Sequence, residues 1–128
     1  MDFTRDGAGF RALRAVIGAS SSDMACVLRV QERAITRWDN GTNTIPAGVW
    51  SESLAIADAA GERVRRAVSD ALAHAGAAGV RVVMPAAAGD RIIAARVASA
   101  LDCAGVPVIV GSEPGEPDGE PGAYVVRV

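Results

Sequence analysis

Residues 18–41, GASSSDMACVLRVQERAITRWDNG, constrain the fold of this chain more than any other segment. Their apolar residues recur at helical spacing, which predicts two short helices joined by a tight turn. The first helix is expected over residues 21–28, with Ser20 as its N-cap. The second is expected over residues 31–39 and stops at Gly41. Two short helices in this layout predict a helix-turn-helix.

The same spacing separates a buried face from an outward face on each of these helices. The first is expected to bury its larger apolar residues: Met24, Val27 and Leu28. The second is expected to bury Ala34, Ile35 and Trp38. Its outward residues are polar or charged: Glu32, Arg33, Thr36 and Arg37. A polar outward face is what a helix needs in order to enter the major groove of DNA.

Two further helices are expected on either side of this motif. The one before it covers residues 9–17 and ends at Gly18. The one after it begins near Pro46, because proline favours the first turn of a helix. Its apolar repeat of three or four residues runs to Ala75 and is rich in alanine and glycine. Gly61 is a candidate break that would divide this long helix into two.

The spacing of apolar residues changes in the last third of the chain. Residues 80–84 and 106–110 predict two strands around a helix at 90–101, a parallel βαβ unit with a right-handed crossover. Residues 111–122, GSEPGEPDGEPG, predict an acidic loop that cannot pack a core. Residues 124–128 alternate as a third strand. Three strands with one helix leave an open sheet face, which the long helix or a second subunit must cover.

The expected fold class is therefore α+β. It combines an N-terminal all-α helix-turn-helix bundle, a long connecting helix and a small C-terminal βαβ(β) domain. The corresponding division is a helix-turn-helix domain at 1–60, a connecting helix at 61–79 and a small α/β domain at 80–128 that is expected to dimerise. The acidic loop at 111–122 belongs to this last domain.

Composition narrows the possible functions. The chain of 128 residues has a net charge of −2, with thirteen arginines and no lysine, so it is not a generally basic nucleic-acid binder. No apolar run approaches the roughly 18 residues of a membrane span, and the charged N-terminus lacks a signal-peptide core. We therefore expect a cytoplasmic protein that does not enter a membrane. Cys26 and Cys103 lack metal-ligand spacing, so no metal or other cofactor is expected.

Four segments together resemble the phage-repressor-like (Xre/Cro) helix-turn-helix family. They are FRALRAVIGAS, the SxxDMACVL stretch, VQERAITRWDNG and the IPAGVW that follows, and they cover roughly residues 8–55. The order of elements outside this region is similar to that of anti-CRISPR-associated and YdiL-like regulators with a C-terminal dimerisation domain. The resemblance implies a regulator that binds double-stranded DNA.

By the family pattern, four residues of the second motif helix face the base edges: Gln31, Glu32, Arg33 and Arg37. Their chemistry agrees, because arginine can donate to guanine, glutamine can pair with adenine and glutamate can accept from cytosine. The alternative is a solvated helix face that any surface helix would show. Glu32 could instead orient Arg33.

Phosphate contacts are expected from polar residues around the motif: Ser21, Ser22, Thr36, Asn40, Thr42, Asn43 and Thr44. The serines lie at a helix N-terminus, where free backbone N–H groups favour anions, although they could serve as caps alone. Asn40 could equally act only to terminate its helix. The others can donate to phosphates without carrying charge.

Three residues are expected to support the motif. In this family Arg14 and Asp39 occupy positions that pair as a structural salt bridge, and Trp38 is interpreted as a core anchor. Arg29 departs from the family, which usually has glycine in this turn because the position tends to need a positive φ. Its side chain would offset the strain if it reached a phosphate.

The leading functional hypothesis is a homodimeric repressor, often of its own promoter, that reads an inverted repeat. One alternative is an antitoxin whose C-terminal domain binds a toxin. A ligand-sensing regulator is another. An enzyme is disfavoured, since the chain has one histidine and lacks the GxGxxG and GxxxxGK[ST] patterns that hold phosphates.

Overall fold

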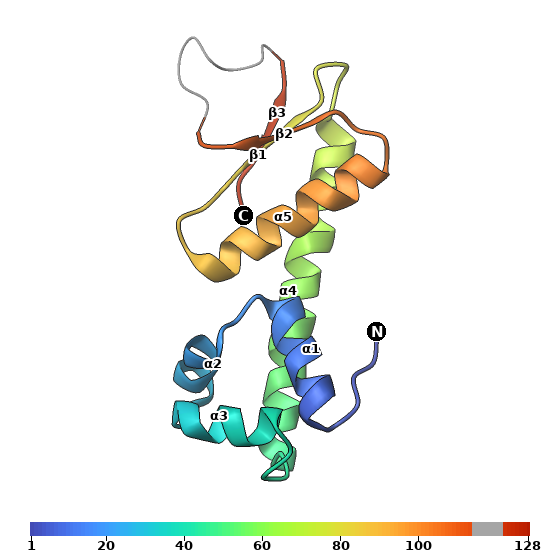
Figure 1. Cartoon of the computed structure of the whole chain (residues 1–128). Helices are drawn as coiled ribbons and strands as arrows, with labels where there is room; N and C mark the ends of the chain where they lie inside the picture. Colours follow the sequence, from blue (N-terminus) through green and yellow to red (C-terminus); the bar gives the residue numbers. More distant parts are fainter. Residues whose placement is uncertain (114–121) are drawn as a thin grey trace. The chain divides into compact units, whose positions relative to one another are not determined.

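The computed structural model describes residues 1–113 and 122–128 of the chain. Within these residues it contains five helices and three strands, which confirms the predicted α+β class (Figure 1). The elements are α1 (Gly7–Ile17), α2 (Ser21–Leu28), α3 (Glu32–Asp39), α4 (Ala47–His74), β1 (Val80–Val83), α5 (Ala88–Cys103), β2 (Val108–Gly111) and β3 (Tyr124–Val126). Most of the expected acidic loop at 111–122 lies outside the described residues.

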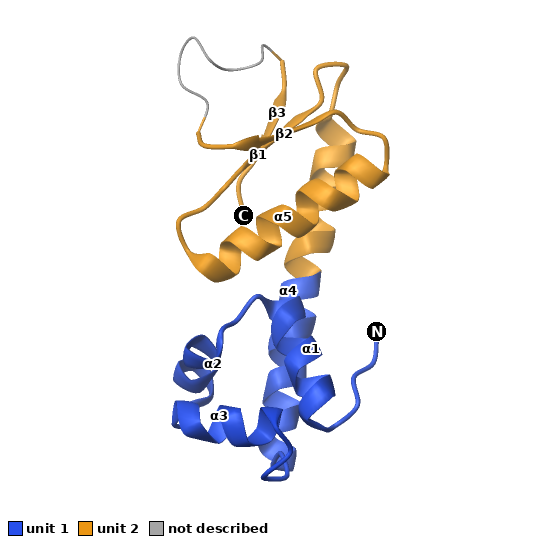
Figure 2. Cartoon of the chain, viewed as in Figure 1, with its two compact units in different colours: residues 1–61 blue, residues 62–128 orange. Residues whose placement is uncertain are grey.

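The chain divides into two compact units at residues 61 and 62 (Figure 2). Unit 1 covers residues 1–61 and holds α1, α2, α3 and the first part of α4. Unit 2 covers residues 62–128 and holds the rest of α4, α5 and the sheet. The long helix thus contributes to both units, and it ends at His74 rather than extending to residue 79.

Unit 1 is built around a core that all three short helices share. Its buried members are Phe10, Met24, Ala25, Leu28, Ile35, Trp38 and Ile45. The rings of Phe10 and Trp38 meet edge to face at 5.9 Å, which joins α1 to α3. Trp38 is therefore a core anchor, as interpreted from the sequence.

Hydrogen bonds at the helix ends explain where α1 and α2 begin. The Asp6 carboxylate accepts from the Gly9 N–H (2.8 Å), so α1 begins at Gly7, two residues earlier than expected. The Ser20 hydroxyl accepts from the Asp23 N–H and the Asp23 carboxylate accepts from the Ser20 N–H, both at 3.1 Å. These bonds form a capping box, and the N-cap prediction for Ser20 is confirmed.

The expected buried position of Val27 is wrong. Its side chain is 53% exposed, and Ala25 takes its place beside Met24 and Leu28. At 3.6 residues per turn, Val27 lies roughly 100° from the centre of the face that Met24, Ala25 and Leu28 define. An eight-residue helix is too short for apolar spacing alone to distinguish the two possible faces.

Gly61 does not break the long helix, since α4 runs without interruption through it. A glycine inside a helix costs only about 1 kcal/mol relative to alanine. The segments on both sides of Gly61 are held by separate cores: Val49, Trp50 and Ile56 pack in unit 1, while Val64, Ala67 and Val68 pack in unit 2. Packing on both sides offsets the local cost.

The sheet in unit 2 is three-stranded and parallel, in the order β2-β1-β3. Val80 pairs with Val108 on one side and with Tyr124 on the other, so the parallel pairing expected of the βαβ unit is confirmed. The core against the sheet is formed by Ala71 of α4, the strand residues Val80, Val82 and Val126, and four residues of α5: Ala94, Val97, Ala98 and Leu101. The long helix therefore covers the sheet together with α5.

Candidate nucleic-acid interface

The outward face of α3 carries the residues expected to read bases. Gln31, at the N-cap position, and Glu32, Arg33, Thr36 and Arg37 are all exposed. On the opposite side, Ile35 and Trp38 are buried and Ala34 is half-buried. The helix therefore presents a polar face to solvent while its apolar face is held in the core of unit 1.

Local contacts on this face involve Gln31 and Thr36. The Arg33 guanidinium donates to the Gln31 side-chain oxygen (3.3 Å), so the neighbour that holds Arg33 is Gln31, whereas the sequence suggested Glu32 for that role. The Thr36 hydroxyl donates to the Glu32 carbonyl at 3.4 Å. A bond to its own helix leaves the Thr36 hydroxyl oxygen able to accept but occupies its proton. Of the predicted phosphate donors, Thr36 is thus partly engaged.

Arg14 joins the three short helices at one point. Its guanidinium forms an ion pair with the Asp39 carboxylate at the end of α3 and donates to the Ser21 hydroxyl (2.9 Å) at the start of α2. The Arg14 and Asp39 side chains are only 13% and 16% exposed. The guanidinium also lies over the Phe10 ring, 5.6 Å from its centroid. This is the pair that the family resemblance implies, and it sets the position of α3.

Three of the residues predicted to contact phosphates, Ser21, Asn40 and Thr42, therefore also have structural contacts. The Ser21 hydroxyl accepts from Arg14, although its own proton stays available for donation. The Asn40 side-chain oxygen accepts from the backbone N–H of Thr42 (3.0 Å) and from the Thr42 hydroxyl. This Asx turn shapes the loop after α3 and uses the Thr42 proton internally. Ser22, Asn43 and Thr44 are exposed.

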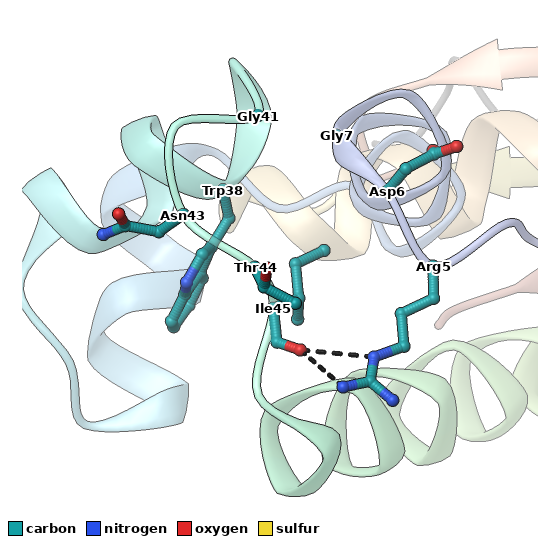
Figure 3. Close-up of a pocket in the computed structure, with 8 residues that line it drawn as sticks. All are labelled: Arg5, Asp6, Gly7, Trp38, Gly41, Asn43, Thr44 and Ile45. Atoms are coloured by element: carbon teal, nitrogen blue, oxygen red, sulfur yellow. Dashed lines mark hydrogen bonds between the residues drawn. The ribbon is translucent and has the colours of Figure 1, made fainter.

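Asn43 and Thr44 line a shallow pocket of about 180 Å³ at the end of α3 (Figure 3). The Asn43 N–H donates to the Arg37 carbonyl (3.2 Å), which ties the loop to the last turn of α3. Arg5 lies at the same pocket, and its Nε and one terminal nitrogen donate to the Ile45 carbonyl at 3.2 and 2.9 Å (Figure 3). The loop is thus fixed at both of its ends.

Sequence reasoning missed three contacts with α3 and the loop that follows it. Arg5 binds the Ile45 carbonyl, and Arg11 donates to the Asp39 carbonyl (2.7 Å). Gly7 approaches Asp39 so closely that a Cβ on Gly7 would lie 2.2 Å from the Asp39 carbonyl oxygen. The spacing of residues in the sequence does not reveal these two arginine contacts, because each arginine binds a backbone carbonyl that lies far away along the chain. A glycine at a helix start could have signalled a close approach.

The turn between α2 and α3 has the conformation expected at Arg29. Its φ of 58° makes it the single non-glycine residue with a positive φ among the described residues. Arg29 caps α2, donating its N–H to the Cys26 carbonyl (3.3 Å), and the Val30 N–H donates to the Ala25 carbonyl (3.0 Å). A left-handed arginine costs roughly 1 kcal/mol, which the core contacts on both sides of the turn must offset.

Comparisons with known proteins found no relative of this chain. No protein-family model matches the chain, and neither the curated proteins nor the solved structures gave a match. Within the described residues, no helix is both long and apolar enough to cross a membrane. Function must therefore be argued from the geometry of the chain itself.

Proposed function

We propose that this protein is a sequence-specific DNA-binding regulator that inserts α3 into the major groove. The observation that carries the proposal is the two-sided character of α3. One side is anchored in the core through Ile35 and Trp38, and the other exposes Gln31, Glu32, Arg33 and Arg37 together. A rigidly held helix with donors and acceptors on its free face matches the requirements of direct readout.

The contacts around α3 support this proposal, because reading bases requires a fixed register. Arg14 connects Asp39 of α3 with Ser21 of α2, and Arg11 binds the Asp39 carbonyl. In the proposed complex Ser22 and the N-terminus of α2 approach one phosphate. Asn43 and Thr44 approach another from the loop after α3.

We further propose that the regulator acts as a homodimer on an inverted repeat, typically as a repressor. The net charge of −2 provides little general attraction for DNA, so one copy of α3 would bind weakly. Two copies spaced by one DNA turn, about 34 Å, would combine their affinities. Occlusion of a promoter by such a dimer is the simplest mechanism.

Selection of bound sequences from a random pool of duplex DNA tests the proposal. We expect a palindromic consensus whose half-sites are about one helical turn apart. An enriched site without symmetry would keep DNA reading but remove the dimer. A pool that shows no enrichment over several rounds at low salt would overturn the proposal.

A further inference from the structure

A groove in unit 2 runs between the second part of α4 and β3. It comprises two adjoining pockets of about 260 and 240 Å³, which share Ala67, Asp70 and Arg127. From Asp70 the helix wall continues to Arg63, while the strand wall continues from Tyr124 to residue 128. At one end His74 of α4 stacks on Tyr124, with ring centroids 4.9 Å apart. The helix and the strand are thus antiparallel walls of one groove.

Among the residues that the structure describes, the strand wall is a free edge of the sheet. β3 is the outermost strand, and it pairs only with β1 among the described residues. The Tyr124 N–H donates to the Gly79 carbonyl (3.1 Å), so Tyr124 directs its backbone groups toward β1. Because these directions alternate along a strand, Val125 points its N–H and C=O away from β1. Val125 also lines the groove. A second extended chain could bond to these groups.

Charge indicates which kind of chain would fit. The groove is lined by three arginines, Arg63, Arg66 and Arg127, and by one acid, Asp70. The carboxylates that pair with these arginines, Asp90, Glu62 and Glu113, do not line the groove. Because solvent screens such exposed ion pairs, each contributes little to stability. An incoming carboxylate can therefore replace them at small cost.

We propose that this groove binds an extended acidic segment of another protein, which adds a strand to the free edge of β3. Backbone bonds to Val125 would supply affinity that does not depend on sequence, and the three arginines would select acidic side chains. The site lies entirely in unit 2, so the proposal does not rest on DNA binding by α3. It gives the protein a second, separate interaction surface.

The test is an NMR titration of the ¹⁵N-labelled full chain with the acetylated and amidated pentapeptide Glu-Val-Glu-Val-Glu. Saturable shifts of the Val125, Ala67 and Asp70 amides are expected. The same peptide with lysine in place of glutamate should not bind. A peptide N-methylated at its valines should bind more weakly, since it lacks donors for the strand edge. No saturable shift at these amides, or equal binding of the lysine peptide, would overturn the proposal.

Two neighbouring arginines provide a matched pair of variants. Arg65 and Arg66 both bind the Glu62 carboxylate, but only Arg66 lines the groove. Arg66→Gln should raise the peptide Kd about two- to fivefold, the effect of one exposed charge, and Arg65→Gln should leave it unchanged. Equal effects of the two substitutions would contradict the assigned groove. The proposal would also be contradicted if raising the protein concentration alone produced the same amide shifts, because the groove would then bind a second copy of the chain. An equal response to a single-stranded oligonucleotide would contradict it as well.

Discussion

Arg14 of α1 and Asp39 of α3 form an ion pair that is largely buried in unit 1. The Arg14 Nε and one Asp39 carboxylate oxygen are buried without a hydrogen-bond partner in the described structure. The pair thus has an energetic cost, which the bond from Arg14 to Ser21 and the contact with the Phe10 ring partly offset. It orients three helices at once.

Removal of one partner of this pair should destabilise unit 1. Arg14→Met leaves the Asp39 carboxylate buried without its counter-ion, which we expect to lower the free energy of unfolding by about 2–4 kcal/mol. Both tryptophans of the chain, Trp38 and Trp50, lie in unit 1, so their fluorescence during urea unfolding reports on this unit. Arg33→Met, at an exposed site, is the control and should stay within about 0.5 kcal/mol of the parent. Similar values for both variants would contradict a structural role for Arg14.

The proposed insertion of α3 into the major groove of DNA predicts that substitutions on its outward face lower the affinity for DNA. Arg33→Ala and Arg37→Ala should each weaken binding to the selected site by about 1–3 kcal/mol, with unchanged urea unfolding. Arg65→Ala on α4 removes the same charge outside unit 1 and should have little effect. Fluorescence anisotropy at fixed salt measures all three. If the α3 variants bound like the parent, the outward face of α3 would be an ordinary solvated surface.

Two substitutions of the turn residue Arg29 distinguish an effect of backbone strain from an effect of a phosphate contact. Arg29→Gly should raise the free energy of unfolding by about 0.5–1 kcal/mol, because glycine adopts a positive φ freely. Arg29→Ala keeps the strain and should change stability little. Both variants lack the guanidinium, so equal losses of DNA affinity with a smaller salt slope would assign Arg29 a phosphate contact. Unchanged affinity would limit its role to the turn.

The periodicity of apolar residues was sufficient to predict each helix and strand, although β2 buries no face fully and leaves Ile109 and Val110 exposed. It could not decide whether Ala25 or Val27 is buried, because α2 is short and both residues lie near the border between its apolar and polar faces. It also could not place Arg5 and Arg11, whose partners are backbone carbonyls 40 and 28 residues away. Such contacts depend on the tertiary packing and have no repeat. The parallel direction of β3 likewise has no local signal, since direction depends on the path of the preceding connection.

Acid should weaken unit 1 through the carboxylates at the helix starts. The Gly9 N–H bond lowers the pKa of Asp6 below its ordinary value of 3.8, and the Ser20 N–H bond does the same for the pKa of Asp23. A pKa lowered on folding stabilises the fold fully above the unfolded-state pKa, and this contribution is lost as pH falls through the folded-state pKa. We expect unit 1 to lose stability below about pH 4. An asparagine side-chain oxygen can still accept these two N–H bonds but does not titrate. In the double variant Asp6→Asn and Asp23→Asn, the midpoint of urea unfolding should therefore fall less steeply with decreasing pH than in the parent. An unchanged dependence on pH would exclude these two carboxylates as its cause.

The close approach of α1 to α3 predicts opposite effects for two glycine substitutions in unit 1. A Cβ at Gly7 would lie 2.2 Å from the Asp39 carbonyl oxygen and 2.9 Å from that of Trp38, so backbone must move to admit it. Gly7→Ala should cost about 1–3 kcal/mol and, because Asp39 ends α3, the helix that we propose to bind DNA, should also weaken DNA binding. Gly48, in the first turn of α4, has open space around the same position. Gly48→Ala should be neutral or stabilising by up to about 1 kcal/mol, with unchanged DNA affinity. If Gly7→Ala were as well tolerated as Gly48→Ala in urea unfolding, the contact between the start of α1 and the end of α3 would not constrain the position of α3.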